Sequence, residues 1–158
     1  RAYDRVYAGT DFVLVVVMDS DSLFPDDVRE ILTGQVRTFA PGLSRVIGIC
    51  VEETESWMLA DEEAVMTAYP EADRTIIREY LQDSVCGTWE VLCRAILREK
   101  AHGLIRIGYP AIGQYKQEWA HRISRYMEPD RNVSPSFSRF SEELIQVSNR
   151  IGHFVARV

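Results

Sequence analysis

One short stretch, DFVLVVVMDSDSL at Asp11–Leu23, constrains the fold more than any other part of the sequence. Its seven consecutive apolar residues, Phe12–Met18, include four valines and show no polar alternation. Such a β-branched run predicts a strand buried on both faces, as in a parallel sheet covered by helices. Asp19 and Asp21 follow at once. Because α/β proteins keep their sites beyond the carboxyl ends of the strands, both aspartates are predicted at a functional edge.

The next two segments predict a parallel crossover. Asp26–Phe39 has apolar residues at helical spacing, and Arg45–Val51 is a second candidate for a buried strand. A strand, a helix and a strand in this order favour parallel pairing, so the residues that follow each strand should leave the sheet at one edge. Glu53 and Glu55 follow the second strand as Asp19 follows the first.

These acids are candidate ligands for Mg²⁺ or Mn²⁺, since hard cations prefer oxygen ligands. Asp19 and Asp21 would hold one ion, and Glu53 and Glu55 would hold a second ion or orient its waters. Lys116, or a nearby arginine, would neutralise charge in a phosphoryl-transfer transition state. Purely structural roles stay open: Asp and Ser commonly form turns and caps after strands, and acids stabilise helix N-termini.

The rest of the chain is predicted to be mainly helical, and residues 1–158 are expected to form a single domain. A short strand at Leu104–Ile107 is an open alternative within this part. The expected helices span Thr54–Tyr69, Arg74–Leu81, Trp89–Lys100, Lys116–Met127 and Ser141–Ile151.

Composition narrows the class of protein. No apolar run approaches the roughly 20 residues of a membrane helix, and no basic-then-apolar leader precedes the first strand, so neither a membrane partner nor a signal peptide is expected. Cys50, Cys86 and Cys93 lack CxxC spacing, so free thiols are expected, as in a cytoplasmic protein. Residues 1–71 carry a net charge of −9 and residues 72–158 one of +3. An acidic site beside a basic wall would suit nucleic acid as a partner, although two solvated faces would give the same pattern.

Three segments resemble the uncharacterised bacterial family DUF4276, which belongs to the TOPRIM-like group. The first is the VVVMDSD strand end, and the second is EETESWMLAD at Glu52–Asp61, similar to that family's E-x-E-x-W-x-x-A-D pattern. The third is YKQEWAHRIS followed by SPSF at Ser134–Phe137. Together they cover residues 11–140.

The resemblance implies an α/β fold of TOPRIM type, Rossmann-like and three-layered, with a parallel sheet flanked by helices and a helical C-terminal half. It implies a Mg²⁺-dependent nuclease-like domain related to the OLD class, with nucleic acid as substrate and a protein partner in phage defence. The TOPRIM glutamate lies on a strand before the DxD strand, whereas only ten residues precede Asp11 here. Together with the helix-like stretch at Arg1–Ala8, this suggests that an N-terminal strand and helix are missing.

Two alternatives to a nuclease remain open at this stage. One is a non-catalytic TOPRIM-like module that binds a protein partner. The other is a haloacid-dehalogenase-like phosphatase, which also places a DxD after a buried strand. In that enzyme class Asp19 would be the covalent nucleophile and Asp21 the general acid. Leu23 stands where such enzymes usually place threonine or valine.

Overall fold

The fold is described by a computed structural model of residues 12–155. Strands β1 (Val13–Asp19) and β2 (Ser44–Cys50) pair in parallel, with Val13 opposite Ser44 and Asp19 opposite Cys50. Helix α2 (Pro25–Phe39) connects them. The predicted strand, helix and strand and their parallel pairing are therefore confirmed within a residue or two. The stretch Arg1–Ala8 lies outside the described residues.

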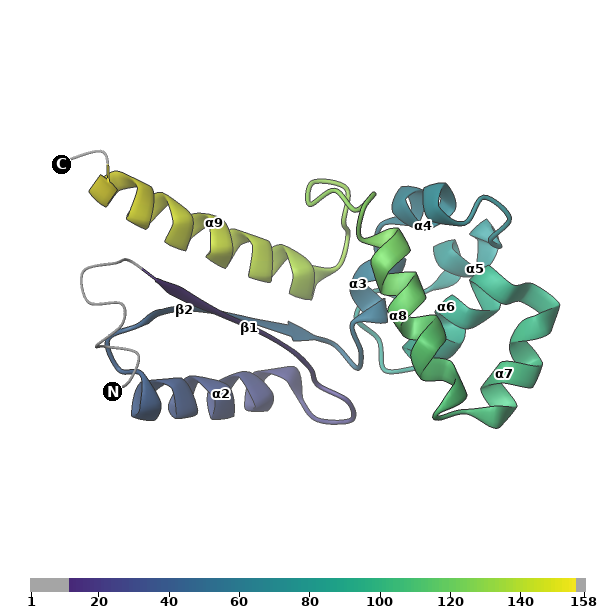
Figure 1. The fold of residues 1–158 in the computed structure, drawn as a ribbon, viewed down its shortest axis with the longest axis horizontal. Coiled ribbons are helices and arrows are strands. Elements are labelled where there is room, and N and C mark those ends of the chain that lie inside the picture. Colours follow the sequence, from purple (N-terminus) through teal and green to yellow (C-terminus); the bar gives the residue numbers. More distant parts are fainter. Residues whose placement is uncertain (1–11, 156–158) are drawn as a thin grey trace.

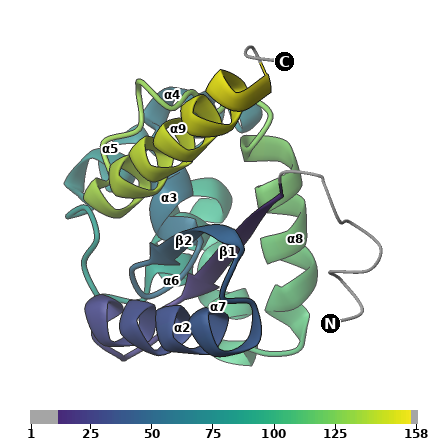
Figure 2. The same cartoon turned by 90° about the vertical axis from the view of Figure 1, so that its left-hand side faces the viewer.

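The sheet lies between two helices (Figures 1 and 2), α2 on one face and α9 (Pro135–Val155) on the other. Side chains of β2 alternate between the two faces. Ile47 and Ile49 form a small core with Val28 of α2, whereas Gly48 faces Phe140 of α9. The protein is thus of mixed α/β class, although the sheet has only two strands in the described part of the chain.

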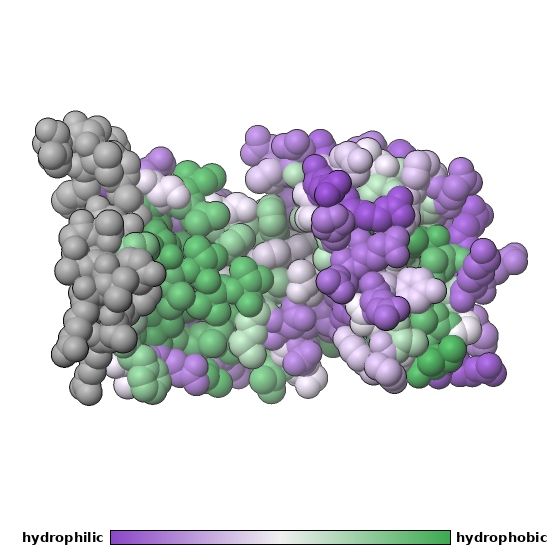
Figure 3. Space-filling view, viewed as in Figure 1, coloured by the Kyte–Doolittle hydropathy of each residue, from purple (hydrophilic) through white to green (hydrophobic). Residues whose placement is uncertain are grey.

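Strand β1 is not buried on both faces, so that prediction is wrong for it. Val15, Val17 and Met18 are 44 %, 46 % and 46 % exposed, whereas Val46–Cys50 of β2 are all buried. Both flanking helices pack mainly on β2 and leave β1 as a partly uncovered edge strand. Figure 3 shows the resulting apolar surface over the sheet. The run of valines indicated a strand but could not show whether helices would cover both of its faces.

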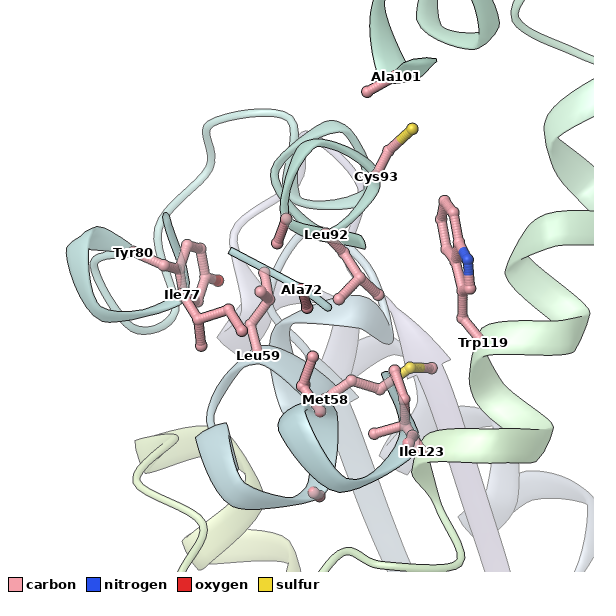
Figure 4. Close-up of a cluster of buried hydrophobic side chains, with 14 of the residues drawn as sticks. Met58, Leu59, Ala72, Ile77, Tyr80, Leu92, Cys93, Ala101, Trp119 and Ile123 are labelled. Atoms are coloured by element: carbon pink, nitrogen blue, oxygen red, sulfur yellow. The ribbon is translucent and has the colours of Figure 1, made fainter. Parts of the chain in front are cut away.

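The chain between β2 and α9 forms a separate helical half with its own core (Figure 4), which includes Leu59, Leu92, Trp119 and Ile123. Helix α9 then returns to the sheet, so the helical half lies in the middle of the sequence rather than at its C-terminal end. None of the helices described could cross a bilayer. The elements of this half are α3 (Glu55–Leu59), α4 (Glu62–Ala68), α5 (Arg74–Glu79), α6 (Thr88–Leu97), the 3-10 helix η1 (Arg98–Lys100), α7 (Ala101–Ile107) and α8 (Ala111–Ile123).

Two further expectations are corrected here. The single helix expected over Thr54–Tyr69 is two helices, because Asp61 interrupts it and caps α4 by accepting a hydrogen bond from Ala64 N at 3.1 Å. The segment Leu104–Ile107 belongs to helix α7 and is not a strand. Its apolar run is too short for periodicity to separate the two structures.

Gly48→Ala is expected to destabilise the protein by about 1–3 kcal/mol, because a methyl group would overpack the interface between β2 and α9. An added Cβ would lie 2.8 Å from Phe140 Cδ2 and 2.9 Å from Trp57 Cη2. Gly34→Ala in α2 is the control: its Cβ meets no atom within 4 Å, so it should be neutral or stabilising. Urea denaturation of both variants checks this. Equal stabilities would show that the interface is loosely packed.

Candidate functional site

The loops after β1 and β2 leave the sheet at the same edge and are hydrogen-bonded to each other. Ser20 N donates to Cys50 O and Asp21 N donates to Glu52 O, both at 2.9 Å. In return Glu52 N donates to the hydroxyl oxygen of Ser20 at 2.9 Å, and Ser20 is buried. The expectation that both acidic segments emerge side by side at one edge is therefore confirmed.

The Asp19 carboxylate is tied to the second loop, whereas Asp21 is open to solvent. Thr54 Oγ1 donates to Asp19 Oδ1 at 2.6 Å. Asp19 Oδ2 and the exposed Asp21 carboxylate accept no hydrogen bond from any residue that the structure describes. These oxygens keep lone pairs free for waters or a cation at the carboxyl edge.

Backbone strain is concentrated at this edge. Asp21 and Glu52 have φ angles of 49° and 61°, in the left-handed region that residues other than glycine rarely adopt. Each such conformation costs on the order of 1–3 kcal/mol and persists only where surrounding contacts fix it. Here the hydrogen bonds between the two loops supply those contacts. Strain of this kind is typical of functional sites.

Lys116 of α8 forms ion pairs with Glu53 and Glu55, two of the predicted metal ligands. Its Nζ lies 3.1 Å from Glu53 Oε1 and 3.2 Å from Glu55 Oε2. The three side chains are 16 %, 19 % and 3 % exposed respectively. The sequence predicts that Lys116 neutralises charge in a transition state, but it does not predict that Lys116 pairs with both glutamates. The group contains two carboxylates and one ammonium.

Burial and pairing act in opposite directions on this group. Burial raises the pKa of Glu53 and Glu55 above the ordinary value, more than the neighbouring Lys116 lowers it. Although burial alone would lower the pKa of Lys116, its two glutamates raise it. The lysine therefore stays charged at neutral pH, whereas the carboxylates are its poorly solvated partners.

Glu52 has a structural role at the start of α6. Its carboxylate accepts hydrogen bonds from the backbone N–H groups of Cys86, Gly87 and Thr88, at 3.1, 3.0 and 2.8 Å, and from the Thr88 hydroxyl. Although burial alone would raise the pKa of Glu52, these bonds lower it below the ordinary value. The carboxylate thus occupies the anion-attracting end of the helix and fixes the second loop to the helical half.

Glu52→Gln is expected to lower the free energy of unfolding by about 1–3 kcal/mol, because the variant loses charge-assisted hydrogen bonds. A folded-state pKa that is lowered stabilises the protein above the ordinary carboxyl pKa of 4.5. The difference from the wild type should therefore vanish as the pH falls through the lowered pKa. Urea titrations at several pH values check this, with the exposed Glu79→Gln as control. A difference independent of pH would contradict the assignment.

Sequence reasoning missed Asp83, which lies near the same edge. It has a φ of 55° and accepts hydrogen bonds from Ser134 Oγ at 2.8 Å and Ser136 N at 2.7 Å, at the start of α9. Burial raises the pKa of the free, buried Cys50 thiol to about 12, and the charges of Asp19, Glu55 and Asp83 add to this. The thiol of Cys50 therefore stays protonated at neutral pH. Ser134 and Ser136, which bind Asp83, belong to the SPSF segment. That segment did not indicate an acidic partner.

The four predicted ligands do not form one compact metal-binding group. Within the described residues, no three His, Cys, Asp or Glu side chains are placed so that they could hold an ion together. Asp19 and Asp21 keep free carboxylate oxygens, whereas Glu53 and Glu55 form ion pairs with Lys116. The edge thus offers carboxylate oxygens of Asp19 and Asp21 that accept no hydrogen bond from the described residues, and a separate ion-pair group of Lys116, Glu53 and Glu55.

Comparison with known proteins gave no guide to this site. No protein-family model, no curated protein and no solved structure matches the chain.

Proposed function

We propose that the chain is a TOPRIM-like domain that catalyses Mg²⁺-dependent (or Mn²⁺-dependent) phosphoryl transfer on nucleic-acid phosphodiesters, as nucleases do. The supporting observation is the placement of Asp19 and Asp21 at the carboxyl edge of a parallel strand pair, where the loop after β1 is hydrogen-bonded to the loop after β2. Sites in open α/β sheets occur at this edge. The strained backbone of Asp21 is a second feature in favour.

The donor set fits a magnesium ion that retains several waters. Mg²⁺ commonly binds through one or two carboxylates, and both Asp19 and Asp21 have free oxygens in the described structure. A bound ion would polarise the phosphoryl oxygen and lower the pKa of an attacking water. Thr54 would orient the Asp19 carboxylate through their hydrogen bond.

Lys116, Glu53 and Glu55 would act as one unit beside the ion. The two glutamates hold the ammonium of Lys116 in place. A fixed, dehydrated cation stabilises negative charge developing on a transferring phosphoryl group, at no cost of reorganisation during the reaction. This proposal replaces the idea that Glu53 and Glu55 hold a second metal ion.

The resemblance to DUF4276 extends the proposal to a biological setting. It suggests a protein partner in phage defence, and this point depends on the matching DxD, E-x-E-x-W and SPSF segments alone. The expected location in the cytoplasm depends instead on the cysteines without CxxC spacing.

Cleavage and metal binding test the proposal together. The chain is incubated with labelled single- and double-stranded DNA and RNA, with millimolar Mg²⁺, Mn²⁺ or EDTA. Cleavage that requires the metal is expected for at least one substrate. Calorimetric titration with Mn²⁺ should give heat that is lost in Asp19→Asn. No cleavage, together with no heat at millimolar Mn²⁺, would overturn the proposal.

A non-catalytic interaction module is the second candidate. It is favoured by the exposed apolar side chains Val15, Val17 and Met18 of β1, since exposed apolar surface often marks protein contacts. It predicts a protein that binds no divalent ion and whose stability and function are unchanged by Asp19→Asn.

A phosphatase of haloacid-dehalogenase type would instead be trapped at Asp19 by beryllium fluoride, which the nuclease mechanism does not allow.

A further inference from the structure

A cavity of about 390 Å³ lies at the opposite end of the sheet from the acidic edge. It is lined by α2, the start of β2 and α9, and Figure 1 shows the start of β2 between these two helices. Ser44 and Arg45 line it, whereas Cys50 ends the same strand at the acidic edge. At roughly 3.3 Å per residue the two places are about 20 Å apart. The cavity is therefore separate from the candidate site.

The cavity has an excess of positive charge. Three arginines line it (Arg29, Arg45 and Arg150) but only one carboxylate, Glu143. That carboxylate is already paired with Arg29, whose Nη1 lies 3.0 and 3.2 Å from its two oxygens. Arg45 and Arg150 have no carboxylate partner within 4.0 Å in the part of the chain described. Arg150 Nε donates to the backbone oxygen of Gln146 at 3.3 Å, so that guanidinium is hydrogen-bonded but its charge is not neutralised. Guanidinium groups without a carboxylate partner repel each other, and a bound anion would reduce that repulsion.

The other lining groups suit a polar ligand that carries a phosphate. The hydroxyls of Thr33 and Ser44 add hydrogen-bond donors beside the arginines, whereas Ile47 and Val147 are buried and leave little aliphatic surface in the cavity. The planar guanidinium fork matches phosphate geometry in a way that a lysine does not. The volume lies at the lower end of the range for small-molecule sites, which suits a ligand the size of a mononucleotide.

We propose that this cavity binds the phosphate group of a small phosphate-bearing molecule of nucleotide size. Arg45 and Arg150 would bind the phosphate, while the Arg29–Glu143 ion pair holds α2 against α9 and shapes the wall. The site is independent of the acidic edge and of the metal proposed there.

Calorimetric titration with adenosine 5′-monophosphate in EDTA tests this assignment without involving the metal. Adenosine and inorganic phosphate are the comparison ligands. The monophosphate should bind, and adenosine should bind at least tenfold more weakly, because it lacks the charged group. Equal binding of adenosine, or no binding of the monophosphate, would overturn the proposal.

Matched variants locate the site. Arg45→Gln should weaken binding of the monophosphate about tenfold or more. The exposed Arg150→Gln should have the same effect, and it serves as the test if Arg45→Gln does not fold. Arg37→Gln removes the same charge from α2 outside the cavity and should change the affinity less than twofold. Equal losses in all three variants would indicate non-specific attraction and overturn the site.

The source of the phosphate is tested with a short DNA strand without terminal phosphates. The small-molecule site predicts that Arg45→Gln leaves its binding unchanged. Binding of the strand that depends on Arg45, without binding of the monophosphate, would assign the cavity to the nucleic-acid backbone and overturn the small-molecule proposal.

Discussion

Lys116→Met is expected to lower the free energy of unfolding by about 3 kcal/mol at neutral pH. The variant keeps most of the length of the side chain but leaves Glu53 and Glu55 without their cation. Breaking a buried ion pair typically costs about 3–5 kcal/mol, and the partial exposure of Glu53 and Lys116 favours the lower end. Urea denaturation followed by circular dichroism measures the change. Lys100, the other lysine of the sequence, is exposed, so Lys100→Met is the matched control.

The loss should depend on pH in a defined direction. Glu53 and Glu55 have raised pKa values when folded, so the folded state binds their protons more tightly than the unfolded state. Their stabilising contribution is complete below the ordinary carboxyl pKa of 4.5 and is lost as the pH rises through the raised values. Removal of Lys116 raises both pKa values further. The deficit of Lys116→Met should therefore shrink as the pH falls from neutral towards 4.5.

A deficit that stays constant over this pH range would mean that the glutamates are not the cause. A deficit below about 1 kcal/mol would mean that water reaches the carboxylates once the lysine is gone, as at exposed ion pairs. Either result would remove the fixed cation from the proposed site. It would leave the placement of Asp19 and Asp21 untouched.

The arrangement of the sheet could be predicted because the local patterns agree with each other. Val13–Met18 and Val46–Cys50 are apolar runs rich in β-branched residues, and Pro25–Phe39 between them has helical periodicity with a proline at its start. Such a sequence leaves few topologies other than a parallel crossover. Because both strands of a parallel pair end at the same edge, this topology also predicts that the two acidic loops lie side by side.

What the sequence could not disclose depends on contacts between distant segments. Lys116 reaches Glu53 across 63 positions, and Ser134 reaches Asp83 across 51. No local pattern encodes such pairs. The apolar periodicity around Asp61 predicts the middle of a helix and gives no sign of a cap. In the structure Asp61 caps α4 and also accepts a hydrogen bond from Glu128 N at 2.9 Å. The exposure of β1 side chains likewise depends on a distant segment, because α9 packs on β2 rather than on β1.

Asp19→Asn is the second change with a large expected effect, on activity rather than on stability. On the proposed function it should slow metal-dependent cleavage about a thousandfold, equivalent to about 4 kcal/mol of transition-state stabilisation. The amide is neutral and binds a hard cation poorly, but its oxygen still accepts the hydrogen bond from Thr54. Stability should therefore change by less than about 1 kcal/mol. Cleavage rates at saturating Mn²⁺, with denaturation of the same samples, measure both quantities.

Two further variants separate metal binding from positioning of the carboxylate. Asp27→Asn alters an exposed aspartate of α2 and should leave cleavage unchanged. Thr54→Val removes the hydrogen bond to Asp19 but keeps the carboxylate, so Mn²⁺ should still bind while the rate falls by a smaller factor than in Asp19→Asn. If Asp19→Asn retained more than about a tenth of the wild-type rate, the lost interaction would amount to less than about 1.4 kcal/mol. That is too little for a metal ligand, and the aspartate would be a loop residue bound to Thr54 rather than part of a catalytic centre.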